Sequence, residues 1–422
     1  MLLLPDAELV RRDACLPGFA TLFDDQDALK ALQAGFPELA ITSARGVYVR
    51  YKPQTNCLVR YEVETAAGPR MCYAKAHRAD ATGKLNKACR TVTLPGHRAV
   101  LAEQFIVLHC FPDDYKLGAL NVLQDDAHRR AFLQELLPGQ AGLWNEASWQ
   151  TIAYKPERRL VVRVEAENTQ AAIKLYRDID FARADSNATA FYAHPGVSTA
   201  RLVGRSSSHH ALALEWLPGR LLTDALTNAG SQSDVSMLAG VGAALANMHA
   251  GPAQGLSPRT RAMEAKRFDA LADWFAWLLP DLASRVRALA DTLGHLLLSA
   301  PPQTFPVHGD FYHSQVLLDA SGLSLLDFDE AYRGDPAHDL GLFIAHLKRN
   351  ALKGVFDAAF VELAITAFLD GYREVSGQLP PRISLYTAAE LFGLAPHFFR
   401  QRAPDWPELT EAVITLAEEI CP

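Results

Sequence analysis

The chain of 422 residues is poor in cysteine and lacks the features of an exported protein. None of its six cysteines forms a CxxC pair, and most lie in apolar surroundings: Cys15, Cys57, Cys72, Cys89, Cys110 and Cys421. Scattered cysteines of this kind are typical of reduced core residues. The N-terminal MLLLPDAELV lacks a basic segment and is interrupted by Pro5 and Asp6. We therefore expect a cytoplasmic protein without a disulfide framework.

Long hydrophobic runs and an excess of basic charge are also missing. No segment approaches the ~18 uninterrupted apolar residues of a membrane-spanning helix, so we expect no membrane partner. The formal net charge is -7, with 41 basic and 48 acidic residues, which excludes the basic footprint of a nucleic-acid-binding protein. With 49% hydrophobic residues the chain can bury a large core, divided into two or three domains. A small-molecule ligand fits these properties better than a nucleic acid.

A repeat is present in the first half of the chain. YKPQTNCLVRYE (residues 51–62) and YKPERRLVVRVE (residues 154–165) share Tyr-Lys-Pro and then Val-Arg-x-Glu. Each copy is followed by a strand-like segment with one lysine, Lys75 or Lys174, and later by an apolar segment that ends at Pro112 or Pro218. Short Val-, Ile- and Tyr-rich runs bounded by Pro, Gly and Asn predict strands. We interpret the two copies as a duplicated β-rich unit.

After Pro218 the apolar residues recur at three-and-four spacing, which predicts amphipathic helices. The sequence thus indicates an α+β protein with three domains. These are an N-terminal β-rich cap at residues 1–145, a second β-rich unit at residues 146–219, and a helical domain at residues 220–422.

An acidic segment interrupts the helical domain: HGDFYHSQVLLDASGLSLLDFDEAYRGDPAHDLG, residues 308–341. Its spacers are mostly apolar and predict two short buried strands, 316–318 and 323–326, joined by a turn at residues 319–322. Acids at the ends of buried strands need a partner, usually a metal ion or a reacting hydroxyl. A calcium-binding or salt-bridged hairpin is the alternative explanation.

Three side chains in this segment have the chemistry of phosphoryl transfer. Asp310 follows His308-Gly309 on a loop, Gln315 presents an amide oxygen, and Asp327 closes the second strand. An aspartate aimed at a hydroxyl, with a carboxylate and an amide oxygen that hold Mg²⁺ on nucleotide phosphates, is the minimal equipment for this reaction.

The segment resembles the aminoglycoside phosphotransferase and choline kinase-like family, relatives of the protein kinases, whose pattern is H-G-D-x-x-x-x-N, an apolar-Asp pair and G-D-P-x-x-D. The resemblance implies a protein-kinase-like bilobal fold, with residues 146–219 as the N-lobe and 220–422 as the C-lobe. ATP and Mg²⁺ are the implied cofactors, and the acceptor is a hydroxyl of a small molecule such as a sugar, an aminoglycoside or an amino alcohol.

Site residues follow from the same resemblance by position in the motif. Asp310 resembles the catalytic aspartate, while Asp327 and Gln315 occupy the positions of the metal ligands. Structural roles are implied for three further residues of the motif, His308, Asp335 and Asp339.

The departure from the pattern is Gln315, which keeps the amide oxygen but adds one methylene and so puts the strength of the metal site in doubt. Maltokinase-like members also resemble H-G-D-x-x-x-x-Q and carry an N-terminal cap, which points weakly to sugar substrates. The residues after Asp327 follow the broader family instead.

The nucleotide side of the site is predicted from the second β-rich unit. Lys174 resembles the strand lysine that reaches the α- and β-phosphates, and Asp185 in the next helix is the candidate acid partner, although the family usually has glutamate there. Glu215, Trp216 and Leu217 resemble the hinge that binds adenine through its backbone. By contrast, we interpret Lys75 in the first copy as a relic or a surface residue.

The tip of the second copy, YKPERR, has no glycine, unlike the phosphate-binding loop of protein kinases. Arg158 and Arg159 could neutralise phosphate charge by bidentate contacts, or could be exposed loop charges.

The sequence thus predicts a small-molecule kinase that needs ATP and Mg²⁺. The alternative is a non-catalytic, nucleotide-binding pseudokinase-like scaffold or regulator, which the missing glycines and Gln315 favour slightly. The acceptor and the oligomeric state remain open.

Overall fold

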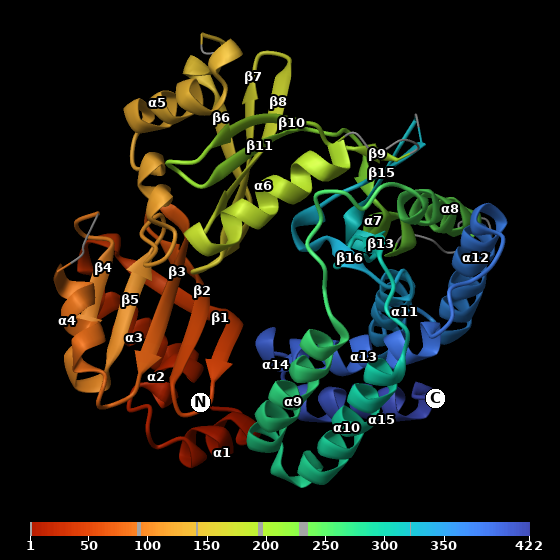
Figure 1. Cartoon of the computed structure of the whole chain (residues 1–422). Coiled ribbons are helices and arrows are strands. Elements are labelled where there is room, and N and C mark those ends of the chain that lie inside the picture. The colour runs from red at the N-terminus through yellow and green to blue at the C-terminus, as the bar shows by residue number, and fades with distance from the viewer. Residues whose placement is uncertain (1, 91–93, 141, 193–196, 228–234, 321) are drawn as a thin grey trace. The chain divides into compact units, whose positions relative to one another are not determined.

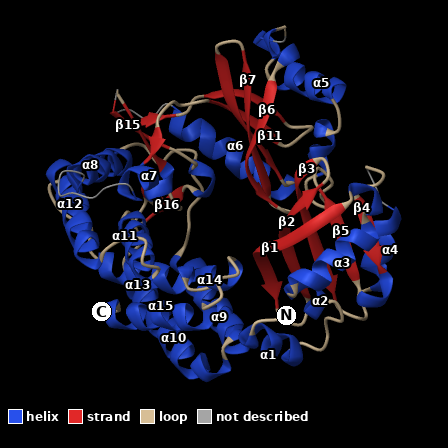
Figure 2. Cartoon of the chain, turned by 180° about the vertical axis from the view of Figure 1, so that it is seen from behind, coloured by secondary structure: helices blue, strands red, loops and turns tan. Residues whose placement is uncertain are grey.

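The computed structural model describes residues 2–90, 94–140, 142–192, 197–227, 235–320 and 322–422. The chain divides into two units (Figures 1 and 2). The first contains Met1–Asp178, Gly204–Ala213 and His397–Pro407, and the second contains Ile179–Val203, Leu214–Pro396 and Glu408–Pro422.

The first unit begins with a five-stranded sheet of order β1-β2-β3-β5-β4. Helices α2 and α3 cover one face of this sheet (Figure 2), where the Tyr61 hydroxyl donates to the Leu22 carbonyl over 2.6 Å. The elements are α1 (Leu4–Arg12), α2 (Phe19–Phe23), α3 (Asp25–Gly35), β1 (Ile41–Lys52), β2 (Asn56–Thr65), β3 (Gly68–His77), α4 (Thr82–Arg90), β4 (Arg98–Leu101) and β5 (Ile106–Cys110).

A second five-stranded sheet follows, of order β10-β11-β8-β7-β6. Read from β6, this is the strand order of the first sheet, so the two sheets have the same topology, as the sequence repeat predicts. The elements are α5 (Asp126–Leu136), β6 (Ser148–Lys155), β7 (Arg159–Ala166), β8 (Thr169–Tyr176), β10 (Leu202–Ser206) and β11 (Ala211–Glu215).

The repeat extends to the hydrogen bonds of the first hairpin in each sheet. In the first copy, the Asp13 carboxylate accepts from the Tyr51 hydroxyl (2.7 Å) and from the backbone N–H of Gln54 (2.8 Å). Gln54, at the hairpin tip, has a left-handed backbone with φ 53°. One carboxylate thus holds both the strand and the tip.

The second copy repeats this arrangement residue for residue. The Asp114 carboxylate accepts from the Tyr154 hydroxyl and from the N–H of Glu157, each over 2.8 Å, and Glu157 has φ 56°. A left-handed conformation is costly for a side-chain-bearing residue unless its surroundings hold it. An aspartate upstream of each Tyr-Lys-Pro motif therefore belongs to the duplicated unit, which extends the repeat beyond the residues that match in sequence.

The tip of the β6–β7 hairpin packs against the first sheet through a buried ion cluster. Glu157, 1% exposed, accepts from Lys75 (2.7 Å) and Arg50 (2.5 Å), and Lys116 lies 3.5 Å away. Burial disfavours the ionised Glu157, but Lys75 and Arg50 outweigh it and hold the pKa of Glu157 below its usual value. Lys75 is therefore neither a relic nor a surface residue, because its side chain is only 12% exposed and anchors the hairpin of the second copy.

The first unit also includes α14 (His397–Arg400) and the residues after it. Asp6 accepts from the Arg402 guanidinium (2.7 Å) and from the Trp406 indole N–H (3.1 Å). The expected division at residue 220 does not anticipate this placement. The domain boundaries at 145 and 219 remain predictions.

The second unit is largely helical. Besides α6 (Asp178–Tyr192), its helices are α7 (Leu222–Thr227), α8 (Ser236–Ala250), α9 (Arg261–Leu278), α10 (Ala283–Ser299), α11 (Ala337–Leu352), α12 (Ala358–Ser376), α13 (Ile383–Leu394) and α15 (Trp406–Ile420). Its short strands are β9 (Ser198–Thr199), β12 (Arg220–Leu221), β13 (Phe305–Val307), β14 (Val316–Asp319), β15 (Gly322–Leu325) and β16 (Tyr332–Gly334).

A buried aromatic cluster forms the core under the acidic segment. Phe311, Phe343 and Phe368 stack with ring centroids 4.2–6.4 Å apart. Helices α8 and α12 pack closely, since a Cβ on Gly371 would lie 1.9 Å from the Ala239 carbonyl oxygen. The predicted strands of the acidic segment are present as β14 and β15. The chain is of the predicted α+β class, and the predicted β-rich region precedes its helical part.

Of the described helices, none is both long and apolar enough to cross a membrane. All six cysteines are free.

The ion cluster makes Glu157 important for stability. We expect Glu157→Gln to lower the free energy of unfolding by about 3 kcal/mol in urea denaturation at neutral pH, because Lys75, Arg50 and Lys116 lose the buried carboxylate that they share. Folding lowers the pKa of Glu157, so its contribution is present above its unfolded pKa and lost as the pH falls through the folded value. The deficit should therefore shrink in acid.

Glu62→Gln is the matched control, since Glu62 pairs with Arg45 on the same sheet but is 50% exposed. This variant should lose less than about 1 kcal/mol. Equal losses in the two variants would contradict a special role for Glu157.

Candidate functional site

The loop that carries Asp310 begins where β13 ends. The backbone N–H groups of His308 and Gly309 donate to the Asp339 carboxylate over 2.7 and 2.9 Å. Gly309 has φ 82°, and a Cβ there would lie 2.2 Å from the Glu330 carbonyl oxygen, so only glycine fits. Asp339 thus anchors the loop at His308 and Gly309. Asp310 follows these two residues and is half-buried.

The same loop is joined to the β14–β15 hairpin. His308 donates from Nε2 to the Leu326 carbonyl (2.7 Å), and its ring lies 4.7 Å from that of Phe328. Leu326 immediately precedes Asp327, so this contact fixes the distance between the two segments that carry Asp310 and Asp327.

Gln315 and Asp327 lie together at the open end of the hairpin. Val316 pairs with Leu325 in the strand register. Beyond this pair, the Leu326 N–H donates to the Gln315 carbonyl over 2.9 Å. Asp327 follows directly and has φ 63°, a left-handed conformation that is uncommon for non-glycine residues and that clusters at functional sites. The antiparallel register therefore brings together the two predicted metal ligands.

The donors suit a hard cation. Gln315 is buried, and no residue in the described part of the chain hydrogen-bonds to its side-chain amide. Its amide atoms are not sealed from solvent, so the amide oxygen is accessible to a ligand. The described residues contain no cluster of three or more His, Cys, Asp or Glu arranged around a metal ion. A carboxylate plus an amide nevertheless fits Mg²⁺, which takes its remaining oxygens from phosphates and water.

Asp339 is the centre of a buried polar network. Besides the two loop N–H groups, its carboxylate contacts His249 Nε2 (3.0 Å) and His338 Nδ1 (3.5 Å). Burial disfavours its charge, but these hydrogen bonds outweigh burial and hold the pKa of Asp339 far below its usual value. His249 in turn contacts the Tyr372 hydroxyl over 2.9 Å. These contacts support the structural roles expected of His308 and Asp339.

The other predicted structural aspartate, Asp335, joins three segments. It is buried and accepts from the N–H of Ala337 (3.0 Å) and from the guanidiniums of Arg261 and Arg382, each over 2.8 Å. It therefore ties the start of α11 to α9 and α13.

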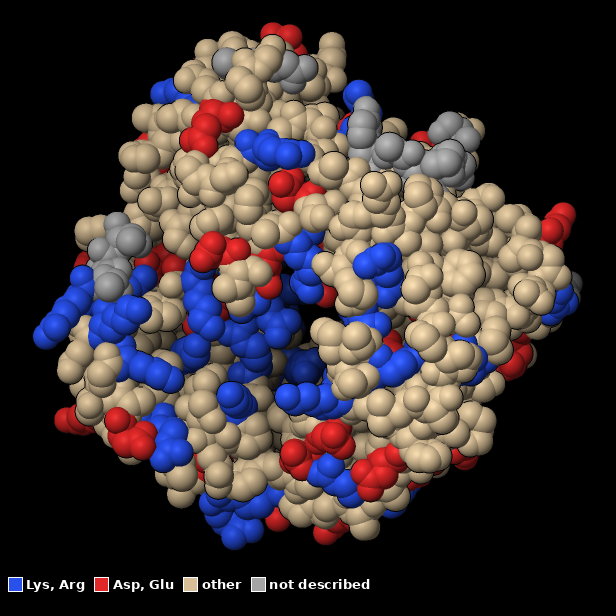
Figure 3. All heavy atoms as spheres, viewed as in Figure 1, with Lys and Arg blue, Asp and Glu red and all other residues tan. Residues whose placement is uncertain are grey.

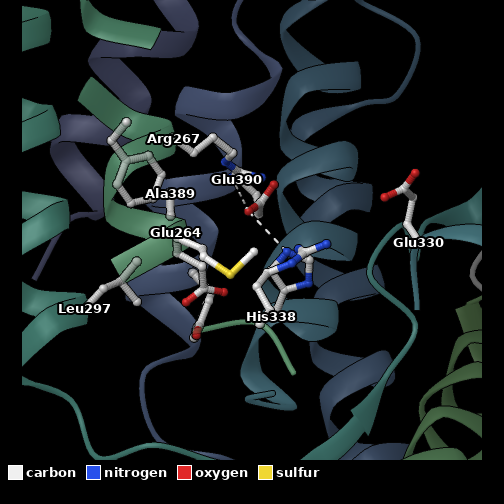
Figure 4. Close-up of a pocket in the computed structure, with 11 residues that line it drawn as sticks. Glu264, Arg267, Leu297, Glu330, His338, Ala389 and Glu390 are labelled. Atoms are coloured by element: carbon white, nitrogen blue, oxygen red, sulfur yellow. Dashed lines mark hydrogen bonds and ion pairs between the residues drawn. The ribbon is translucent and has the colours of Figure 1, made fainter. Parts of the chain in front are cut away.

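His338 connects the loop network to a neighbouring cavity. Its Nε2 lies 3.3 Å from Glu390, which also accepts from Arg267 over 2.6 Å (Figure 4). Although burial opposes protonation, the carboxylates of Glu390 and Asp339 raise the pKa of His338 to about 9. The imidazole is therefore charged at neutral pH.

The cavity has a volume of about 330 Å³ and lies entirely within the second unit. Figure 4 shows Glu264, Arg267, Glu390 and His338 around it, contributed by α9, α11 and α13. Apolar side chains complete the lining, among them Met263, Phe268 and Leu297. The sequence analysis missed this cavity, because its residues come from helices far apart in the chain and share no motif.

The residues predicted to bind the nucleotide are divided between the two units. Lys174 is buried on β8, opposite Val161 of β7, and Asp185 lies on α6. The two residues belong to different units, so their pairing remains a prediction.

In the expected hinge, Glu215 ends β11 and its backbone N–H donates to the Arg201 carbonyl (2.8 Å). Arg201 also binds its carboxylate and lowers the pKa of Glu215. Adenine contacts would therefore fall to the backbone of the half-buried Trp216 and Leu217.

Arg158 is exposed at the tip of the β6–β7 hairpin, and no described carboxylate forms an ion pair with it. Arg159 is half-buried as the first residue of β7, opposite Tyr176. The hairpin thus presents one unneutralised guanidinium.

The sequence pattern of the phosphotransferase enzyme family called APH matches residues 127–377, more than half of the chain. The chain belongs to this family. The matched region contains every predicted catalytic, metal and nucleotide residue, while the first sheet precedes it. No protein with a curated function matches the sequence closely enough to count as a relative.

Solved structures share the fold at low sequence identity, and with the family match they confirm the predicted α+β kinase-like fold that follows a β-rich cap. A putative aminoglycoside phosphotransferase from Ralstonia eutropha is 15% identical with a TM-score of 0.52, covering 70% of this chain and 96% of its own. A mutant of the aminoglycoside phosphotransferase APH(4)-Ia in complex with AMP-PNP and hygromycin B is 14% identical (TM-score 0.51, 67% and 98%). Choline kinase from Cryptosporidium parvum is 11% identical (TM-score 0.51, 70% and 95%).

The charge on His338 predicts a pH-dependent stability. Folding raises its pKa, so its contribution is complete below the unfolded value of about 6.5 and is lost as the pH rises through about 9. The urea stability of His338→Gln should therefore differ most from that of the parent protein near pH 6 and converge with it above pH ~9. A difference independent of pH would contradict a charged imidazole. His128, exposed on α5, provides the control variant His128→Gln.

Proposed function

We propose that the protein is a phosphotransferase that moves the γ-phosphate of ATP to a hydroxyl of a small molecule. The observation that carries this proposal is the pair of anchored segments: Asp310 on a loop held by Asp339, and Asp327 beside Gln315 on a hairpin bonded to the same loop through His308. Family membership and the likeness to an AMP-PNP complex support the nucleotide.

Each residue has a defined task in this proposal. Asp310 accepts a hydrogen bond from the acceptor hydroxyl and orients it towards the γ-phosphate. The proton passes to Asp310 as the hydroxyl oxygen bonds to the γ-phosphorus, and the bond from that phosphorus to the β–γ bridging oxygen breaks and releases ADP. Asp327 and Gln315 would hold Mg²⁺, which supplies positive charge to the phosphates. Lys174, with Arg158 and Arg159 at the hairpin tip, would neutralise the nucleotide phosphates. Catalysis then consists of positioning and electrostatics, in which the rigid loop contributes most.

The cavity beside His338 is the candidate acceptor pocket. Its volume of about 330 Å³ suits a molecule of one or two sugar rings or an amino alcohol. It combines carboxylates of Glu264 and Glu390 with the guanidinium of Arg267, so it can hydrogen-bond hydroxyl and amino groups. Structural neighbours include a choline kinase and an aminoglycoside phosphotransferase in complex with hygromycin B, which supports a small-molecule acceptor.

The non-catalytic alternative is favoured by one observation, the hairpin tip that is locked by Glu157 and lacks glycine. A nucleotide-responsive scaffold would bind ATP without turnover. ADP release measured across pools of sugars, aminoglycosides and amino alcohols separates the two: turnover on any pool supports the kinase, and binding without turnover supports the scaffold.

Asp310→Asn tests the catalytic assignment. With the responsive acceptor, we expect ADP release to fall by about 10²–10⁴-fold, while the dissociation constant for ATP changes little, because the variant loses only the group that orients the hydroxyl. Asp370→Asn, an exposed change on α12, should leave the rate unaltered. Unchanged turnover in Asp310→Asn would exclude Asp310 as the catalytic aspartate.

Asp327→Ala and Gln315→Met test the metal site. Asp327→Ala should abolish Mg²⁺-dependent binding of AMP-PNP in calorimetry, since the metal loses the carboxylate that this proposal assigns to it. Gln315→Met keeps the length of the side chain but removes its oxygen, and should raise the Mg²⁺ concentration needed for half-maximal binding. If Gln315→Met binds Mg²⁺·AMP-PNP like the parent protein, the amide is not a ligand.

A further inference from the structure

Helices α2 and α3 cover one face of the first sheet. The strand register places basic side chains on the other face. Arg50, Leu58 and Lys75 are cross-strand neighbours on β1, β2 and β3, and Tyr48, Arg60 and Tyr73 form the next row. Directly opposite residues in antiparallel strands share a face, so Arg50, Lys75 and Arg60 lie together. We call this surface, with the hairpin tip that packs on it, the basic face.

Two further guanidiniums join the basic face from other elements. Arg158 follows Glu157, which is bound to Arg50 and Lys75. Arg400 is half-buried on α14, which packs on β1, where the Phe399 and Tyr51 ring centroids are 6.2 Å apart. Burial and the nearby charge of Arg158 lower the pKa of Arg400, and Tyr48 opposes this shift. All these residues belong to the first unit.

The basic face has more cationic side chains than carboxylates that could neutralise them. Glu157 is shared by Arg50, Lys75 and Lys116. Among the described residues no carboxylate forms an ion pair with Arg60, Arg158 or Arg400, and Arg60 contacts only the sulfur of Met71. Figure 3 shows Lys and Arg side chains gathered over the first sheet.

Two other arginines of the same sheet are neutralised. Arg45 pairs with Glu62 (2.5 Å), and Arg98 pairs with Asp113 (2.7 Å). The excess is therefore local, and it stands out in a chain whose net charge is -7. Like charges that face one another in partly buried positions repel, and an anion that binds between them removes the repulsion.

We propose that the basic face is a second anion site, which binds a phosphorylated small molecule separately from the nucleotide. Guanidiniums bind phosphate oxygens through paired hydrogen bonds, and Arg60 and Arg400, with the nearby charge of Arg158, suit a ligand with at least two negative charges. The proposal does not depend on the proposed catalytic activity, because Arg60 and Arg400 belong neither to the motif of residues 308–341 nor to the predicted nucleotide ligands, and Arg158, which is predicted to contact the nucleotide, is left unchanged in the test.

Pyrophosphate is the probe, titrated calorimetrically into the full chain in EDTA, so that a metal-dependent nucleotide site does not contribute. The parent protein should bind it, with an affinity that falls as salt is added. The double variant Arg60→Gln/Arg400→Gln should bind about tenfold more weakly or worse, the loss expected for charged hydrogen bonds. The control Arg45→Gln/Arg70→Gln removes the same charge from the same sheet and should bind within about twofold of the parent protein.

Four outcomes would overturn the proposal. The first two are no binding of pyrophosphate by the parent protein and an equal loss of affinity in the control variant. The third is loss of binding in Lys174→Met, which would assign the anion to the nucleotide site. The fourth is tighter, Arg60-dependent binding of a homopolymeric RNA, which would make the basic face a nucleic-acid surface. Thermal unfolding of each variant shows that it is folded. Asp310→Asn should bind pyrophosphate like the parent protein even if no acceptor is ever phosphorylated, so failure here and failure of the proposed function are distinguishable.

Discussion

The candidate site depends on one buried carboxylate, that of Asp339. It accepts from two consecutive backbone N–H groups of the loop before Asp310 and contacts two histidines on different helices. A charge buried without compensation would be prohibitively costly, so the position of the loop and the ionisation of Asp339 are established together. His308 also donates to the Leu326 carbonyl, so the same network holds the segment that contains Gln315 and Asp327. Rigidity at this level is what positioning and electrostatic catalysis require.

The duplicated β-rich unit shows how one structural device can be used for two purposes. In both copies an aspartate binds the tyrosine of the Tyr-Lys-Pro motif and the N–H of a left-handed tip residue. The tip residue is Gln54 in the first copy and Glu157 in the second, and this difference gives the second hairpin the charge that Lys75 and Arg50 bind. The lysine of the first copy thus supports the second copy structurally, while its counterpart Lys174 is the candidate nucleotide ligand.

The parts of the fold that could be predicted were those specified by nearby residues. Period-two and three-and-four patterns indicated the two β units and the helices, and the Asp310 motif with its hairpin followed from spacing and resemblance. Contacts that require separate elements to dock could not be predicted: Glu157 on Lys75, Arg402 and Trp406 on Asp6, and the cavity between α9, α11 and α13. Nothing in the sequence near Lys75 or Asp6 identifies its partner, since that partner is set by three-dimensional packing.

The hairpin tip has a consequence for how a ligand would meet the second β unit. A glycine-rich loop is flexible and loses conformational entropy when it closes over phosphates. Here the backbone at Glu157 is fixed by Asp114 before any ligand arrives, with the side chain held by two cations. Selectivity at this edge would therefore rest on shape complementarity to a rigid template, and a ligand too large for it would be rejected rather than accommodated.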